Sequence, residues 1–116
     1  MKIFQYKIFL VNLDPTIGAE IKKTRPAIIL QNNVSNEYSA VTIVAAITSV
    51  INLPLYPNEV LIHAKEGGLK KDSAVLLNQL RSIDRKRLIK RLGYIYPETM
   101  IKIDNALKIS LGIIGF

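Results

Sequence analysis

Short apolar runs rich in isoleucine and valine recur along this chain, and residues that favour turns separate them. Five segments have this character: 7–13, 25–31, 40–48, the second half of 53–63, and 72–83. Runs of this length, bounded by Gly, Pro, Asn and Asp, predict β-strands in preference to buried helices. The first half of 53–63 is not predicted to be a strand, because Pro54 and Pro57 lack the amide hydrogen that pairing in a sheet needs. No repeat or linker interrupts the series, which predicts one domain over residues 1–116.

The residues after Pro97 have a different period and predict a closing helix. Proline is favoured in the first turn of a helix. Apolar side chains then recur at helical spacing: Met100, Ile103, Leu107 and Leu111. Ile101 and Ile109 widen this apolar stripe. Two interpretations follow: the helix packs both on the sheet and against a second copy of the chain, or it is deeply buried within one domain.

Charge gives the strongest indication of a partner. The chain has 16 Lys and Arg against 9 Asp and Glu, a net charge of +7. Such an excess attracts polyanions, so the composition favours a nucleic acid or an acidic protein as partner over a basic protein with no such role.

No segment approaches the roughly 18 uninterrupted apolar residues of a membrane helix. The N-terminus lacks a signal-peptide cleavage site, and cysteine is absent. We therefore expect a cytoplasmic protein without a membrane partner.

Several kinds of catalytic site are excluded by what the chain lacks. With one histidine and no cysteine, a zinc site is not expected, and His63 is interpreted as a partly buried structural residue. The acidic residues are scattered, without the spacing that gathers a magnesium ion. The segment EGGLKK at 66–71 has the glycines of a phosphate-binding loop but not its Gly-Lys-Ser/Thr ending. We expect no metal and no cofactor.

These exclusions favour a reaction in which the substrate supplies the nucleophile, as RNA does with its 2′-hydroxyl. The protein then has to align the groups and stabilise the charge that grows on the phosphate oxygens. In IKKTRPAIIL, Arg25 directly precedes a buried strand, and its planar guanidinium can bind phosphate through two hydrogen bonds. Thr48 ends the run at 40–48 and offers a hydroxyl. Both residues also have structural alternatives, a loop entering a strand for Arg25 and an ordinary strand end for Thr48.

The combination of these motifs resembles the MazF/PemK/Kid family of toxin endoribonucleases. The resemblance rests on VNLDPTIGAEIKKTRPAIILQNN, VTIVAAITS and SAVLLNQLRSIDRKRL in this order, followed by the closing helix. It implies a mainly β (α+β) fold, an SH3-like small β-barrel with a C-terminal helix, working as a homodimer. It also implies a type II toxin that inhibits translation by cleaving single-stranded RNA without a metal, leaving a 2′,3′-cyclic phosphate and a 5′-hydroxyl. The family's catalytic arginine and hydroxyl fall on Arg25 and Thr48.

The resemblance also implies partners and RNA-binding residues. The expected inhibitor is a small acidic antitoxin with a disordered tail, and the toxin–antitoxin complex is expected to bind DNA. The loop from Asp14 to Lys23 should fold over the RNA. The expected RNA contacts are Gly18, Glu20, Lys22, Lys23, Asn32, Ser49, Gln79 and Arg81. A guanidinium resists deprotonation, so Arg25 is interpreted as oxyanion stabiliser and acid, with Glu20 a minor candidate for the base.

Some of these assignments have open alternatives. Asn32, Ser49 and Gln79 could each make a structural hydrogen bond instead of reading RNA. Gln79 and Arg81 should share a face with Ser73 if no bulge intervenes. The basic run at 84–91 is interpreted as an exposed helical face, with electrostatic steering of RNA as the alternative.

Two features set this chain apart from many family members and bear on RNA sequence preference. They are Gln5-Tyr6-Lys7 in the first strand and Asn32-Asn33 after the second. The alternative functions are a gyrase-poisoning toxin with the same fold and a catalytically inactive RNA-binding module.

Overall fold

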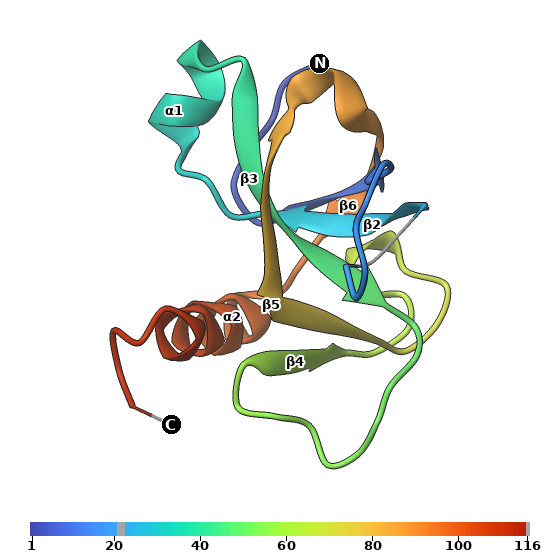
Figure 1. Ribbon diagram of the computed structural model, residues 1–116, viewed down its shortest axis with the longest axis vertical. Coiled ribbons are helices and arrows are strands. Elements are labelled where there is room, and N and C mark those ends of the chain that lie inside the picture. The colour runs from blue at the N-terminus through green and yellow to red at the C-terminus, as the bar shows by residue number, and fades with distance from the viewer. Residues whose placement is uncertain (21–22, 116) are drawn as a thin grey trace.

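The computed structural model describes residues 1–20 and 23–115 (Figure 1). Lys22, one of the predicted RNA contacts, lies outside the described residues. Two short 3₁₀ turns, η1 (Glu66–Gly68) and η2 (Arg85–Arg87), accompany the longer elements. The strands and helices are β1 (Lys7–Asn12), β2 (Thr24–Ile29), α1 (Asn33–Tyr38), β3 (Val41–Thr48), β4 (Glu59–Ile62), β5 (Ser73–Asp84), β6 (Leu88–Tyr94) and α2 (Pro97–Ser110).

All six strands belong to one antiparallel sheet with the order β4-β5-β3-β2-β1-β6. The predicted mainly β fold with a C-terminal helix is confirmed. In the described part of the chain β4 and β6 do not pair, so the sheet is open and not the closed barrel that was expected. The long strand β5 lies between β4 and β3, pairing with β3 along its length and with β4 near its start.

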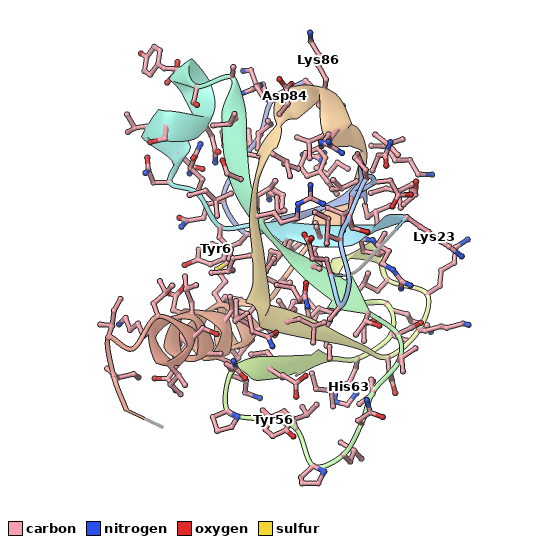
Figure 2. All side chains as sticks on the ribbon, viewed as in Figure 1. Tyr6, Lys23, Tyr56, His63, Asp84 and Lys86 are labelled. Atoms are coloured by element: carbon pink, nitrogen blue, oxygen red, sulfur yellow. The ribbon has the colours of Figure 1, made fainter. Side chains whose placement is uncertain are left out.

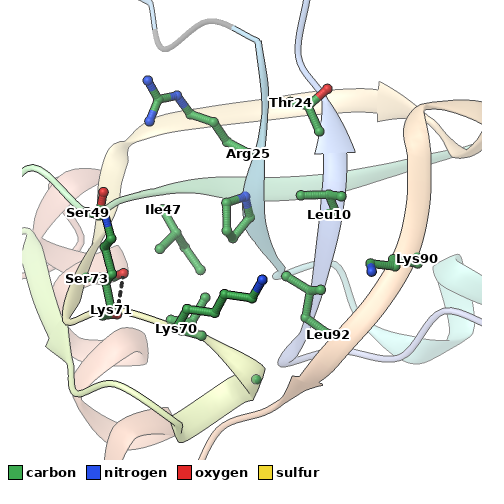
Figure 3. A pocket seen from close by; sticks show the side chains of 13 residues that line it. Leu10, Thr24, Arg25, Ile47, Ser49, Lys70, Lys71, Ser73, Lys90 and Leu92 are labelled. Atoms are coloured by element: carbon green, nitrogen blue, oxygen red, sulfur yellow. Dashed lines mark hydrogen bonds between the residues drawn. The ribbon is translucent and has the colours of Figure 1, made fainter.

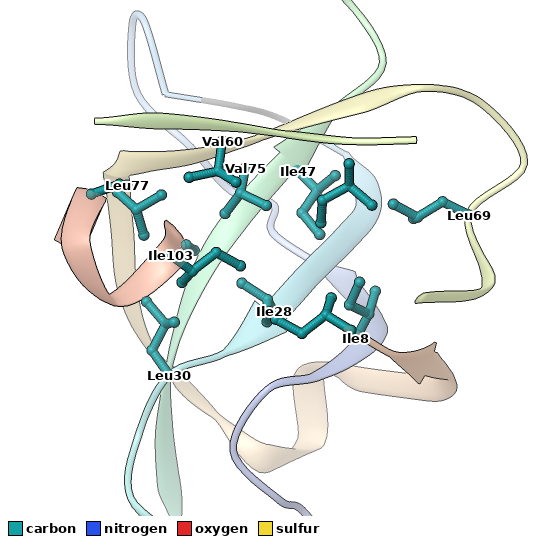
Figure 4. Close-up of a cluster of buried hydrophobic side chains, with 13 residues drawn as sticks. Ile8, Ile28, Leu30, Ile47, Val60, Leu69, Val75, Leu77 and Ile103 are labelled. Carbon is teal, nitrogen blue, oxygen red and sulfur yellow. The ribbon is translucent and has the colours of Figure 1, made fainter. Parts of the chain in front are cut away.

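The central strands bury both of their faces. On one face Ile8, Ile28 and Ile47 pack together with Ile103 from α2 (Figure 4). On the other face lies a second apolar cluster, made of Ile3, Phe9, Val11, Leu13, Ala27, Ile29, Val44, Ala46, Ile83 and Leu88. Strands covered on both sides have apolar residues at successive positions instead of alternating ones. Coverage of both faces therefore explains the continuous apolar runs at 25–31 and 40–48.

Helix α2 packs against the sheet along one side only. Ile103 and Ala106 are buried, whereas Ile101 and Leu111 are 70% and 58% exposed. The interpretation of α2 as deeply buried in one domain is therefore wrong. Tyr6 also ties α2 to the start of the chain, because its hydroxyl donates to Asp104 Oδ1 at 2.5 Å. Burial, together with this hydrogen bond and the charge of the carboxylate, raises the pKa of Tyr6 to about 12.

Two elements differ from the sequence-based expectations. The polar segment between β2 and β3 forms α1, whose N-cap is Asn32, with its Oδ1 accepting from Ser35 N at 2.8 Å. The basic run at 84–91 was expected to be helical, but only η2 is; from Leu88 onward it forms β6. Pairing with β1, which buries Leu88 beside Val11, outweighs the local pattern.

His63 is not partly buried, as the sequence analysis expected. Its side chain is 78% exposed, and its Nδ1 lies 3.9 Å from Asp72 Oδ1 on the surface (Figure 2). Within the described ranges, neither helix has the length and apolar character needed to cross a membrane.

Candidate active site

A pocket of about 420 Å³ opens where β2 begins and β3 ends (Figure 3). Its lining residues are Leu10, Thr24, Arg25, Pro26, Ile47, Ser49, Gly68, Leu69, Lys70, Lys71, Ser73, Lys90 and Leu92. Four of these side chains are cationic and none is acidic. A concave surface with charge of one sign concentrates its field, so this pocket attracts anions.

The strand register brings the two predicted catalytic residues to the same end of the sheet. β2 and β3 pair with Ala27 opposite Ala46. Continuing that antiparallel register by two residues sets Arg25 opposite Thr48, on one face of the sheet. The paired residues of β2 and β3 end at Ala27 and Ala46, so Arg25 and Thr48 lie beyond the hydrogen-bonded part of the two strands. Arg25 lines the pocket, and Thr48 directly precedes Ser49, which also lines it.

The Thr48 hydroxyl is fixed by a hydrogen bond that it accepts, and its own hydrogen remains available to donate. The Thr48 side chain is 8% exposed, and its Oγ1 accepts a hydrogen bond from Val50 N at 3.1 Å. A hydroxyl has one hydrogen to donate besides the lone pairs that accept. Since the Val50 contact uses a lone pair, the Thr48 hydroxyl can still donate to an oxygen of a bound phosphate.

The segment that carries Lys70 and Lys71 is fixed by η1, which packs backbone against backbone on β6. Gly67 and Gly68 have φ of +68° and +75°, a region that favours glycine. A Cβ on Gly68 would lie 2.0 Å from the carbonyl oxygen of Leu92. The glycines of EGGLKK therefore serve this close approach, and they do not cradle a phosphate themselves.

Glu66 joins η1 to the start of α2. Its Oε2 accepts from Tyr96 N at 3.0 Å and from the Thr99 hydroxyl at 2.6 Å. Tyr96 is the N-cap residue of α2, and its own side chain makes no capping hydrogen bond. Glu66 thus supplies the acceptor that the first turn of α2 needs. Sequence reasoning did not assign a role to this residue.

The described part of the loop between β1 and β2 is closed by its own hydrogen bonds. Glu20 Oε1 accepts from Ile17 N at 2.8 Å, and Asp14 Oδ1 accepts from Lys23 N at 2.9 Å. Gly18 has φ of +58°, in the left-handed region that favours glycine. Gly18, Glu20 and Lys23 are exposed and do not line the pocket. Their contacts with RNA stay a prediction.

Arg81 and Gln79 lie away from Ser73 because β5 contains a bulge. Pairing with β3 passes from Ala46–Leu76 to Ala45–Leu80, so β5 has three extra residues, 77–79, between two successive residues of β3. An odd number of extra residues reverses the alternation of faces, so the condition for a face shared with Ser73, a strand without a bulge, is not met. The Arg81 guanidinium donates to the carbonyl oxygen of Leu13, and this contact fixes the base of the β1–β2 loop.

The structure therefore separates the predicted site residues. Arg25 and Ser49 line the pocket, whereas Thr48 adjoins Ser49 in the chain and is not itself a lining residue. Asn32 caps α1 at the opposite end of β2 from Arg25. Sequence reasoning missed the pocket residues Lys70, Lys71, Ser73 and Lys90. The basic segments at 66–71 and 84–91 were the signals available, but they did not show which lysines face inward.

A basic, antiparallel β-domain with a packed C-terminal helix and a cationic pocket defines a class of small polyanion-binding proteins. The chain belongs to the PemK/MazF family, because residues 4–111 match the family described as PemK-like, MazF-like toxin of type II toxin–antitoxin system. It is 45% identical over 109 residues to endoribonuclease MazF of Staphylococcus epidermidis, covering 94% of this chain and 91% of that one. The predicted family and enzyme class, an endoribonuclease toxin, are confirmed.

Solved structures agree with this assignment. MazF from Deinococcus radiodurans superimposes with a TM-score of 0.82 at 25% identity, covering 97% of this chain and 98% of that one. A mycobacterial endoribonuclease in complex with its cognate antitoxin has a TM-score of 0.81 at 21% identity and covers 98% and 99% of the two chains. The second likeness concerns the fold alone.

Proposed function

We propose that this protein inhibits translation as a toxin by cleaving single-stranded messenger RNA in the cytoplasm, without a metal ion. The observation that carries the proposal is the position of Arg25 on a pocket with four cations and no carboxylate, with Thr48 opposite it by register. That environment suits a phosphodiester, whose charge increases during the reaction.

In the proposed reaction, the RNA supplies its own nucleophile. A 2′-oxygen attacks the adjacent phosphorus, the bond from phosphorus to the 5′-oxygen breaks, and the products are a 2′,3′-cyclic phosphate and a 5′-hydroxyl. The 2′-hydroxyl loses a proton and the leaving 5′-oxygen gains one. Arg25 stabilises the negative charge on the phosphate oxygens and donates hydrogen bonds to them. Thr48 donates a further hydrogen bond.

Neither Glu20 nor Arg25 is assigned as the acceptor of the 2′-hydroxyl proton. Glu20 was the minor candidate from sequence, but its Oε1 accepts from Ile17 N and it does not line the pocket. A guanidinium stays protonated under ordinary conditions, so we assign Arg25 no role as base. The proposal therefore assigns charge stabilisation to Arg25 and leaves proton removal to another group.

The proposed partners follow from the surface. Two exposed apolar side chains, Ile101 on α2 and Leu111 directly after it, suit a second copy of the chain in a homodimer. The net charge of +7 suits an acidic antitoxin whose disordered tail occupies the RNA-binding surface. That complex is the form proposed to bind DNA.

An RNA digest tests the proposed function. Purified protein is incubated with single-stranded RNA in EDTA, and the fragment ends are identified by mass spectrometry. Fragments with cyclic phosphate and 5′-hydroxyl ends support the proposal. Arg25→Ala, purified identically, controls for a contaminating nuclease. Loss of all cleavage on chelation would contradict the metal-free reaction, and gyrase inhibition with intact RNA would favour the poisoning alternative.

A further inference from the structure

The pocket has a second cationic side that the proposed reaction does not use. Lys70 and Lys90 line it from two different elements, the segment after η1 and strand β6. In Figure 3 the Lys70 side chain lies across the pocket towards Leu92, and Lys90 is on that same side, whereas the Arg25 guanidinium points elsewhere. Within residues 1–20 and 23–115, neither lysine forms an ion pair with a carboxylate.

Between these cations, the pocket is apolar. Its apolar lining residues are Leu10, Pro26, Ile47, Leu69 and Leu92. Such a surface suits the apolar face of a base, which buries area against aliphatic side chains whatever the sequence. A volume of about 420 Å³ falls within the range of small-molecule pockets, so a single nucleotide unit is a suitable occupant.

Both lysines are held on rigid backbone. Lys70 follows Leu69, which is 5% exposed and whose carbonyl oxygen accepts from Lys65 N at 2.7 Å. The preceding glycine turn packs against Leu92, so the segment has little room to shift. Lys90 pairs with Leu10 of β1 in the sheet. Groups fixed before binding lose less entropy when a ligand arrives, which increases what their contacts contribute.

We propose that Lys70 and Lys90 form a second phosphate-binding subsite, which holds a phosphate next to the one that is cleaved. The nucleotide between the two phosphates lies on the apolar floor. Lys70 and Lys90 are positioning residues: they fix the register of the RNA so that the reacting phosphate meets Arg25. This inference rests on the proposed cleavage of RNA and adds a subsite to it.

The first test measures salt dependence. Binding of single-stranded RNA with a 2′-deoxy nucleotide at the mapped cleavage position is titrated between low and high salt. Each phosphate contact contributes about 0.7 to the slope of log affinity against log salt for single strands. Lys70→Gln and Lys90→Gln should each reduce the slope by about 0.7, and the double variant by about 1.4. Lys86→Gln and Lys102→Gln, which remove the same charge from exposed sites outside the pocket, should leave it unchanged.

The second test couples the lysines to one phosphate of the RNA. Neutral methylphosphonate replaces each phosphate in turn around the cleavage position. In the wild type, one neighbouring replacement should weaken binding, raise KM and also lower kcat, because the reacting phosphate is then less well positioned. The same replacement should cost the Lys70→Gln/Lys90→Gln variant nothing further, and Lys90→Arg should restore the coupling.

The outcomes separate the subsite from the function on which it rests. If the wild type does not cleave RNA, the proposed function fails, while the salt slope on undigested RNA still tests the lysines. If the wild type cleaves but the pocket lysines behave like Lys86 and Lys102, the subsite is wrong. Additive losses for the lysine variants and every methylphosphonate would also overturn it.

Discussion

Glu66 and Thr99 are joined by a buried hydrogen bond of 2.6 Å, which connects the turn beside the pocket lysines to the helix that closes the fold. The same carboxylate oxygen accepts from Tyr96 N. One side chain thus both caps α2 and fixes the segment leading to Lys70. Stability of the helix and geometry of the pocket are coupled through this residue.

Glu66→Ala should therefore lower the free energy of unfolding by about 2 kcal/mol, since it leaves the buried Thr99 hydroxyl and the partly buried Tyr96 amide without an acceptor. Glu66→Gln keeps one acceptor oxygen and should cost less. Urea titration measures both. Glu98→Ala is the matched control, because Glu98 is an exposed carboxylate in the first turn of the same helix. Equal effects at Glu66 and Glu98 would show that only the helix dipole matters.

Gly68→Ala should prevent folding or cost more than about 4 kcal/mol, because its Cβ would lie 2.0 Å from the Leu92 carbonyl oxygen. Gly112→Ala separates this clash from backbone strain. Gly112 has a similar φ of +73° but no atom within 4 Å of its would-be Cβ, so its replacement should cost about 1–2 kcal/mol. Thermal unfolding of the two variants makes the comparison, and similar losses would contradict the close packing of η1 on β6.

Arg25→Ala should reduce the rate of RNA cleavage by roughly 10²–10³-fold, the usual effect of removing one oxyanion donor. Arg25→Lys should restore only part of it, since an ammonium keeps the charge but loses the planar fork. Thr48→Ala should be less severe, because a neutral hydroxyl makes a weaker hydrogen bond to phosphate. Thr48→Ser should be close to wild type. Near-normal turnover in folded Arg25→Ala would show that the catalytic assignment is wrong.

The central strands and the closing helix could be predicted because their signals are local. Each signal lies within a short stretch of sequence: the apolar runs at 25–31 and 40–48, and the helical spacing after Pro97. Strand β6 could not be predicted this way, because its partner is β1 at the other end of the chain. The bulge at 77–79 was equally hidden, and it decides where Arg81 points.

A site residue could be predicted where a side chain suited to binding phosphate also lies at the end of a predicted strand. Site residues brought together by contacts between distant segments could not. Arg25 has both a fitting side chain and a place at the mouth of a strand. Lys70 and Lys90 come together only because glycine permits η1 to pack on β6, which is a property of contacts between distant segments. Asn32 has a suitable amide for reading a base, but the structure uses it to cap α1.

The stability of the chain should fall as pH rises from about 10 to about 12, and Tyr6 should account for part of this. Burial and the contact with Asp104 raise the pKa of Tyr6 from 10.0 to about 12, so the folded state favours the protonated phenol. That contribution is fully present below the pKa of the unfolded chain and is lost as pH passes through the folded value. Tyr6→Phe should flatten this part of the profile. Parallel curves for the two proteins would contradict the shift.

An acidic peptide should compete with RNA for the pocket, because both are polyanions and the pocket offers only cationic charged groups. Binding of a labelled, uncleavable RNA is measured while an unlabelled peptide rich in Asp, Glu and apolar residues is added. RNA should be displaced, and each ligand should bind more weakly as salt increases. Lys70→Gln/Lys90→Gln should weaken both ligands, whereas Lys102→Gln should weaken neither. A peptide of the same composition with Asp and Glu replaced by Asn and Gln controls for apolar binding. Simultaneous, independent binding of peptide and RNA would show that the two polyanions occupy separate surfaces.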